Sequence, residues 1–154
     1  MNMVYERILV AIDGSDESEW AFKKAVNIAK RNSAKLLICN VIDARELSGV
    51  TYGLYADTRL SKEAETYAHN LLEKRKQAAV EMGVEQVETL IKFGSPKTKI
   101  SKEIAPEYDV DLIVCGATGM NTVERLMIGS VSENILRYAT CDVLVVRTPK
   151  EEDV

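Results

Sequence analysis

The sequence has little of what metal sites, disulfide frameworks and membrane spans require. It contains three widely separated cysteines, Cys39, Cys115 and Cys141, and a single histidine, His69. No Cys-x-x-Cys pair occurs, so a zinc site built from cysteine and histidine is not expected. No apolar run approaches the roughly 20 residues of a membrane-spanning helix, and no basic leader precedes the first apolar segment. We therefore expect a cytoplasmic protein without a membrane partner.

Basic residues are not concentrated along the chain either. The 24 Asp and Glu residues outnumber the 20 Lys and Arg residues, and basic residues stand together only in short groups such as Lys23-Lys24. Because nucleic-acid binding depends on clustered cations that contact phosphates, no nucleic-acid partner is expected. A chain of 154 residues with 46% hydrophobic residues is sufficient for one globular domain over residues 1–154.

Five apolar segments alternate with segments of helical periodicity, at 8–12, 36–42, 87–93, 112–115 and 143–146. This alternation predicts an α/β protein with a parallel sheet and helices on both faces. Helices are expected to begin at Ser15 or Asp16, at Ser95-Pro96, and at a capping box formed by residues 130–133. The segment from Ala44 to Asp57, which contains Tyr52 and Tyr55, is expected to be a long loop. The tyrosine pair could close over a bound base, although a loosely packed surface loop is the simpler interpretation.

The residues that follow the strands are the candidates for a binding site, because ligands of open parallel sheets lie outside the carboxyl ends of the strands. Asp13-Gly14-Ser15 follows the first strand and Asp43 the second. The segment from Gly116 to Ser130 follows the fourth with the pattern Gly-x2-Gly-x9-Gly-Ser. Glycines allow close approach of a phosphate, and a helix N-terminus attracts an anion. The alternative is that these glycines only turn the chain and that the serine only caps a helix.

These segments resemble the universal stress protein family, and in particular its ATP-binding branch. The resemblance covers Ile8-Leu9-Val10-Ala11-Ile12-Asp13-Gly14-Ser15, Asp111-Leu112-Ile113-Val114-Cys115-Gly116, and the segment from Gly129-Ser130-Val131-Ser132 to the last strand. It implies an open, Rossmann-like, five-stranded parallel sheet of strand order 3-2-1-4-5. It also implies a homodimer that pairs through the last strand, Val143-Leu144-Val145-Val146, an apolar edge that is expected to be covered.

The resemblance implies ATP as the ligand. Adenine is expected near Ala11 and Val41, and the ribose near Asp13 and Gly116. The phosphates are expected on residues of the glycine motif and the last helix, namely Gly119, Gly129, Ser130, Val131 and Ser132. Many family members have a basic residue where this chain has Thr118, which leaves more of the phosphate charge to a metal ion, Mg²⁺ or Mn²⁺. A second departure is Asp142, where many members have proline.

The pattern favours a nucleotide-dependent switch or sensor. The alternatives are a slow ATPase or a nucleotidyl- or phosphoryl-transfer enzyme, and a binding protein whose nucleotide site stays empty. No catalytic residue is assigned, because Asp13 has no partner carboxylate and Ser15 has no His/Asp pair to activate it. His69 is expected to be a solvated surface residue, and Trp20 and Phe22 are expected to serve packing.

Overall fold

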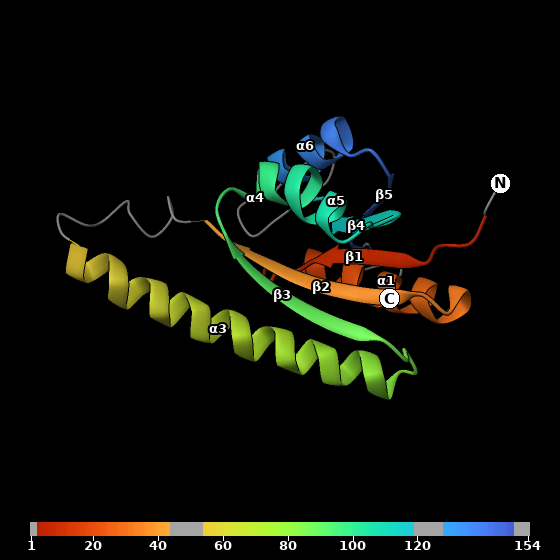
Figure 1. Cartoon of the computed structure of the whole chain (residues 1–154), viewed down its shortest axis with the longest axis horizontal. Helices are drawn as coiled ribbons and strands as arrows, with labels where there is room; N and C mark the ends of the chain where they lie inside the picture. The colour runs from red at the N-terminus through yellow and green to blue at the C-terminus, as the bar shows by residue number, and fades with distance from the viewer. Residues whose placement is uncertain (1–2, 44–53, 119–127, 150–154) are drawn as a thin grey trace.

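The computed structural model describes residues 3–43, 54–118 and 128–149, which form a five-stranded sheet with helices on both sides (Figure 1). The strands are β1 (Arg7–Ala11), β2 (Lys35–Ile42), β3 (Val87–Phe93), β4 (Leu112–Gly116) and β5 (Asp142–Val146). They are parallel throughout and lie in the order β3-β2-β1-β4-β5. The predicted fold class and strand order are confirmed.

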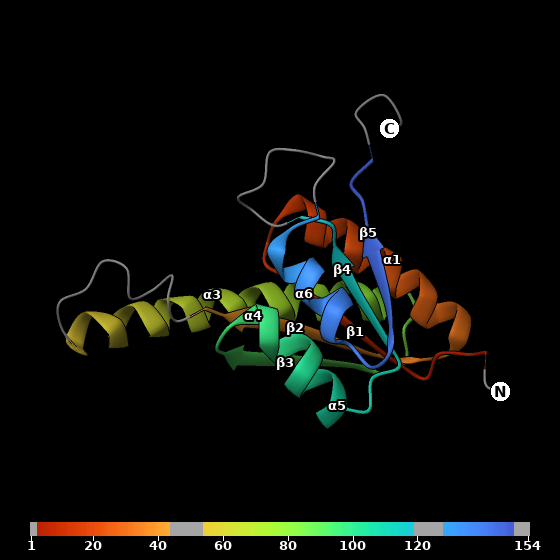
Figure 2. The same ribbon diagram turned by 90° about the horizontal axis from the view of Figure 1, so that it is seen from above.

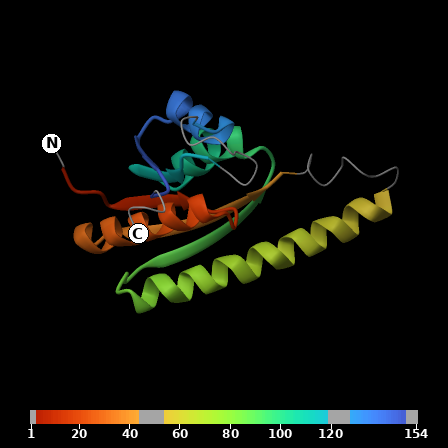
Figure 3. The same ribbon diagram turned by 180° about the vertical axis from the view of Figure 1, so that it is seen from behind.

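Alternate residues of the central strands point to opposite faces of the sheet, and each face is covered by different helices. On one side, Ile8 and Val10 of β1 pack with α1 (Asp16–Asn32) and α3 (Leu54–Glu81). On the other side, Leu9 packs with η1 (Lys99–Ile104), α5 (Ala105–Glu107) and α6 (Ser130–Tyr138), and the short α4 (Pro96–Thr98) lies beside them. Figures 1 and 3 show the helices on the two faces of the sheet, and Figure 2 is a view onto the face covered by α4, α5 and α6.

Helix boundaries follow local sequence in most places. Ser15 is the N-cap of α1, as expected, and its side chain accepts a hydrogen bond from the Ser18 amide. Gly83, beyond the end of α3, has a φ of +106°, which glycine adopts without strain. Pro96 begins α4, also as expected, and the helical segment continues as the π-helix η1.

Two expectations are wrong. No capping box forms at residues 130–133, because α6 begins at Ser130 itself and its N-cap is Gly129, with no side-chain capping bond. Ser132 is instead turned inward, where its hydroxyl reaches the carbonyl of Ala117. The expected loop at 44–57 is also too long, since α3 begins at Leu54; residues 44–53, with Tyr52, lie outside the described residues.

The cysteines and aromatic residues lie where their types predict. Cys39 and Cys115 are buried in the core, and desolvation raises the pKa of each thiol to about 12. Phe22 is buried and Trp20 packs against the same core cluster. His69 is exposed on α3. No helix within the described ranges is both long and apolar enough to cross a membrane.

Candidate functional site

The candidate site lies where the chain leaves two neighbouring strands in opposite directions. β1 pairs with both β2 and β4, and the chain continues from β1 toward β2 but from β4 toward β5. The carboxyl ends of β1 and β4 therefore form the topological switch point of the sheet, which is the usual ligand position in open α/β folds. The structure brings Asp13 and Gly116, predicted from separate motifs, to this edge.

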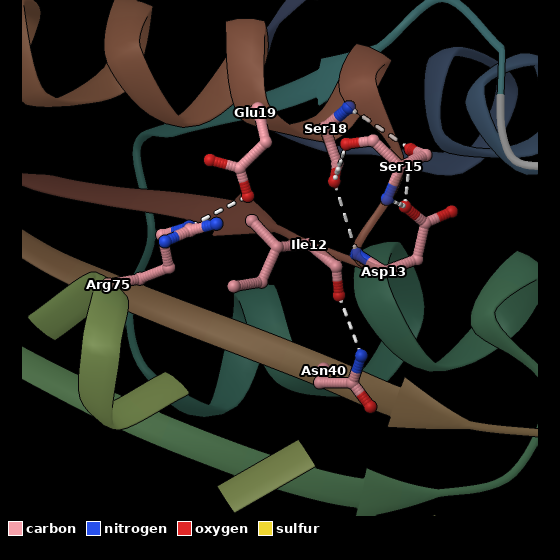
Figure 4. Close-up of polar contacts among 7 residues, drawn as sticks. All are labelled: Ile12, Asp13, Ser15, Ser18, Glu19, Asn40 and Arg75. Atoms are coloured by element: carbon pink, nitrogen blue, oxygen red, sulfur yellow. Dashed lines mark hydrogen bonds and ion pairs between the residues drawn. The ribbon is translucent and has the colours of Figure 1, made fainter. Parts of the chain in front are cut away.

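The turn after β1 is held by its own side chains (Figure 4). One carboxylate oxygen of Asp13, Oδ1, accepts hydrogen bonds from the Ser15 amide, at 2.9 Å, and from the Ser15 hydroxyl. The Ser15 hydroxyl also accepts a hydrogen bond from the Ser18 amide at 3.2 Å. The other Asp13 oxygen points away from this turn in Figure 4. Asp13 is exposed, so this second oxygen can contact a ligand.

Two further contacts support the turn from below. The buried Asn40 of β2 donates from Nδ2 to the Ile12 carbonyl oxygen at 2.7 Å, which fixes the chain just before Asp13. Glu19 in the first turns of α1 forms a half-buried ion pair with Arg75 of α3, with 2.7 Å between Oε1 and Nε. Figure 4 shows the Asn40 bond directly before Asp13 and the Glu19–Arg75 pair farther from Asp13, beyond Ser18. The turn is thus fixed by β2, and the start of α1 that follows it is fixed by α3.

The start of α6 is attached directly to the end of β4. The Gly129 amide donates to the Ala117 carbonyl oxygen at 2.7 Å, and the Ser132 hydroxyl donates to the same oxygen at 2.9 Å. The Ala117 amide in turn donates to the Val146 carbonyl at the end of β5. These bonds bring Gly129, Ser130 and Val131 to the carboxyl edge of the sheet. Because Ser132 is buried and its hydroxyl proton is engaged, this hydroxyl anchors the start of α6 to the end of β4.

Three of the predicted apolar site residues lie on the same side of the sheet. Ala11 of β1, Val41 of β2 and Val131 of α6 are partly buried and pack against the same core cluster. This is the face covered by η1 and α6. Each residue keeps part of its surface exposed near the carboxyl edge, which suits contact with a flat apolar ring.

The structure gives Gly116 a packing role that the motif did not predict. A Cβ atom built on this residue would lie 3.0 Å from the backbone carbon and oxygen of Glu17. Glycine therefore allows the first turn of α1 to approach the end of β4 closely, which brings the two halves of the switch point together. Gly119, the second glycine of the motif, and residues 120–127 lie outside the described residues.

Sequence reasoning missed Ser18, Asn40 and Tyr67. A Cβ built on Gly14, whose φ is +86°, would lie 2.5 Å from the Tyr67 hydroxyl oxygen, so this tyrosine of α3 stands over the Asp13 turn. Ser18 carries a local signal, since it lies three residues after the N-cap, where its amide is expected to be capped. Asn40 and Tyr67 carry no such signal, because their contacts depend on the pairing of distant elements.

The described part of the chain holds no group of three His, Cys, Asp or Glu side chains able to bind a metal ion. Mg²⁺ usually keeps several waters and binds through one or two carboxylates together with substrate phosphates. The described residues therefore suit an ion that would be held mainly by its own waters and by the phosphates of a ligand. They do not form a resident metal centre.

Comparison with known proteins identifies the family. The universal stress protein family model matches residues 4–147. A putative universal stress protein of Staphylococcus saprophyticus is 51% identical over 146 residues, covering 95% of this chain and 86% of the relative. The structure of universal stress protein UspA from Lactobacillus plantarum has a TM-score of 0.82 and 33% identity, covering 95% of this chain and 100% of that one. A universal stress protein in complex with cAMP has a TM-score of 0.71 and 29% identity, covering 95% and 99%. This chain belongs to the universal stress protein family.

Proposed function

We propose that this protein binds ATP at the carboxyl edge between β1 and β4 and acts as a nucleotide-dependent switch or sensor. The observation that carries the proposal is the start of α6, which has no side-chain cap and is hydrogen-bonded to the end of β4, at the same edge of the sheet as the exposed Asp13 carboxylate. Uncapped amides at a helix N-terminus attract phosphate groups. The related protein solved with cAMP supports a nucleotide as the ligand class.

The proposed ligand would use three parts of the site. The adenine would lie against Ala11 and Val41, which are partly exposed on the α6 face of the sheet. The free oxygen of Asp13 would accept a hydrogen bond from a ribose hydroxyl. The phosphates would contact the amides of Ser130 and Val131, with Mg²⁺ or Mn²⁺ as the counter-ion. Gly116, which has no side chain, would contribute by allowing the start of α1 to lie close to the ligand. Gly119 would contact the phosphates.

Isothermal titration calorimetry of the purified protein tests the ligand. Titrations with ATP, AMP, cAMP and adenosine, with and without Mg²⁺, separate the contributions of base, sugar and phosphates. We expect ATP to bind more tightly than AMP, and adenosine to bind most weakly, because the phosphates contact the start of α6. Equal affinities for ATP and adenosine would contradict the proposed phosphate position, and no binding of any of these ligands would contradict nucleotide binding itself.

The arrangement favours a switch over an ATPase. Phosphoryl transfer needs a group that orients the attacking water and cations that stabilise the charge of the transition state. Among the described residues, the carboxylate Asp13 lies at the proposed sugar position and not at the phosphates. Where many family members have a basic residue, this chain has the uncharged Thr118. Steady-state measurement of ADP release at saturating ATP and Mg²⁺ separates the two functions. Turnover on the scale of seconds would favour the enzyme.

We further propose a homodimer that pairs through β5. This strand is an edge of the sheet, and Val143, Leu144 and Val145 keep part of their surface exposed. Unpaired backbone groups on an apolar edge favour pairing with a second strand. Light scattering at micromolar concentration should give twice the monomer mass. Val145→Pro should yield monomers or insoluble protein, because proline removes a backbone donor, whereas Val145→Thr, which keeps the amide, should remain dimeric. A monomer mass for the parent protein would contradict the dimer.

A further inference from the structure

We infer that Ser18 is a positioning residue of the nucleotide site, an inference that rests on the proposed function. Ser18 lies in the first turn of α1, and only 4% of its surface is exposed. It is too deeply buried to form part of the ligand-facing surface. Its effect would be exerted through the turn formed by Asp13, Gly14 and Ser15, which carries the carboxylate proposed to bind the ribose.

The Ser18 hydroxyl connects the two ends of this turn. Its oxygen accepts a hydrogen bond from the Asp13 amide at 3.3 Å and donates to the Ser15 carbonyl oxygen at 2.9 Å. Gly14, between these two residues, has no side chain and a φ of +86°, a region that glycine enters without strain. The glycine permits the turn without enforcing it. The Ser18 hydroxyl therefore ties both ends of the turn to the interior of α1, in addition to the Asp13–Ser15 bonds within the turn.

The main chain of Ser18 also holds the side chain that orients the carboxylate, through a bond that any residue at this position can make. The Ser18 amide donates to the Ser15 hydroxyl oxygen, and that hydroxyl donates to Oδ1 of Asp13 (Figure 4). With Oδ1 engaged in this way, Oδ2 is left to face a ligand. A chain of hydrogen bonds thus runs from the interior of α1 to the proposed ribose contact.

The first test is the Ser18→Ala variant with Ser101→Ala as its matched control. Ser18→Ala leaves the Asp13 amide and the Ser15 carbonyl without this partner, so ATP and AMP should both bind about threefold to tenfold more weakly, the equivalent of about one net hydrogen bond. Ser101 is equally buried, but it lies in η1 on the opposite side of the sheet and its hydroxyl has no hydrogen-bond partner among the described residues. Ser101→Ala should bind both nucleotides within about twofold of the parent. An equal loss in both variants would overturn the inference.

A double-mutant cycle measured by calorimetry tests whether Ser18 acts through Asp13. If it does, Asp13→Ala combined with Ser18→Ala should bind no more weakly than Asp13→Ala alone, since the carboxylate to be positioned is already absent. Additive losses would overturn the inference. Ser18→Thr keeps the hydroxyl, so it should bind nucleotides as the parent protein does. This variant also serves if Ser18→Ala fails to fold. A loss of affinity in Ser18→Thr as large as that in Asp13→Ala would count against the role of the hydroxyl.

Hydrogen exchange gives a readout that does not require a ligand. In the parent protein the Asp13 amide is bonded to Ser18, so its exchange in NMR spectra should be slowed, and Ser18→Ala should accelerate it selectively. An unchanged exchange rate would overturn the inference whether or not nucleotides bind. If the parent binds no nucleotide, the proposed function fails by itself, and accelerated exchange would still establish that Ser18 holds the turn.

Discussion

The two helices that begin at the switch point have very different N-termini. α1 is capped by the Ser15 side chain and carries three acidic residues in its first turn, Asp16, Glu17 and Glu19. α6 has Gly129 at its N-cap with no side-chain capping bond, and the acidic residue in its first turn is Glu133, which forms an exposed ion pair with Arg137 at 3.2 Å. Both helices point their partial positive charge at the same edge of the sheet.

This difference indicates that the two helix dipoles serve different purposes. Acidic residues in a first turn each stabilise a helix by about 0.3–1 kcal/mol, and they also repel a further anion. The acids of α1 therefore contribute to the stability of the domain and discourage phosphate binding there. Replacing a capping serine by glycine costs a helix only a few tenths of a kcal/mol. At α6 this small loss leaves the amides available to a ligand, so phosphates are expected at α6 and the neutral sugar at α1.

The largest expected effect comes from filling the space at the α6 end. Gly129→Val should reduce ATP affinity by at least about 100-fold, because it blocks two or more hydrogen bonds to a charged group, each of about 1.5–3 kcal/mol. The fold should be retained, since Gly129 has a φ of −65° and a ψ of 160°, which valine adopts readily. Calorimetry measures the loss, and circular dichroism checks the fold.

Adenosine is the control for this variant. It lacks phosphates, so its affinity should differ from that of the parent protein by no more than about twofold. If Gly129→Val bound ATP as tightly as the parent, the phosphates would not lie at α6, and the contrast between the two helices would lose its functional meaning.

A second experiment makes the α6 end electrostatically similar to the α1 end. Ser130 is exposed at the first position of α6, so Ser130→Glu adds one carboxylate to the helix terminus without burying it. ATP affinity should fall by about 2–3 kcal/mol, the scale of repulsion between a carboxylate and several phosphate charges at the protein surface. Thermal stability should rise slightly, because the new charge favours the helix dipole.

Ser130→Gln is the matched control, since it has the same length without the charge. The difference between Glu and Gln variants should shrink in high salt, where charges at this distance are screened. A loss of equal size in both variants would indicate steric obstruction, and the electrostatic part of the comparison would then be wrong.

The fold was predictable because its signals are local and repeated. The five apolar segments predict the five strands, and residue type narrows the cap of α1 to Ser15 or Asp16, of which Ser15 is the one observed. The predicted start of α6 at Ser130 is confirmed as well, but the capping box is not, because Ser130 is the first helical residue and Gly129 is the N-cap. The hydroxyl of Ser132 bonds to Ala117, fifteen residues earlier, a contact that depends on where β4 ends. Local patterns of hydrogen-bonding side chains cannot anticipate such a tertiary contact.

The site was predictable in outline for a related reason. The carboxyl ends of parallel strands meet at one edge, so Asp13 and Gly116 could be placed together from topology. Their supports could not, because the Asn40 bond to Ile12 and the position of Tyr67 over Gly14 require the register between elements. Gly116 is expected near the ribose, whereas its close approach to Glu17 gives it a packing role that only the three-dimensional structure reveals.

The smallest expected effect belongs to the α1 end and tests whether it contacts only the sugar. Asp13→Ala should weaken ATP and AMP binding by the same amount, about 1–2 kcal/mol, because both nucleotides carry the ribose that the carboxylate would contact. Asp13→Asn, which keeps an oxygen acceptor for Ser15, should lose less than the alanine variant. Calorimetry with both nucleotides at low and high salt measures the difference, and denaturant unfolding separates it from any loss of stability at the start of α1. A loss confined to ATP would mean that Asp13 acts through the phosphates or their metal ion. Both helix termini would then act on the phosphates.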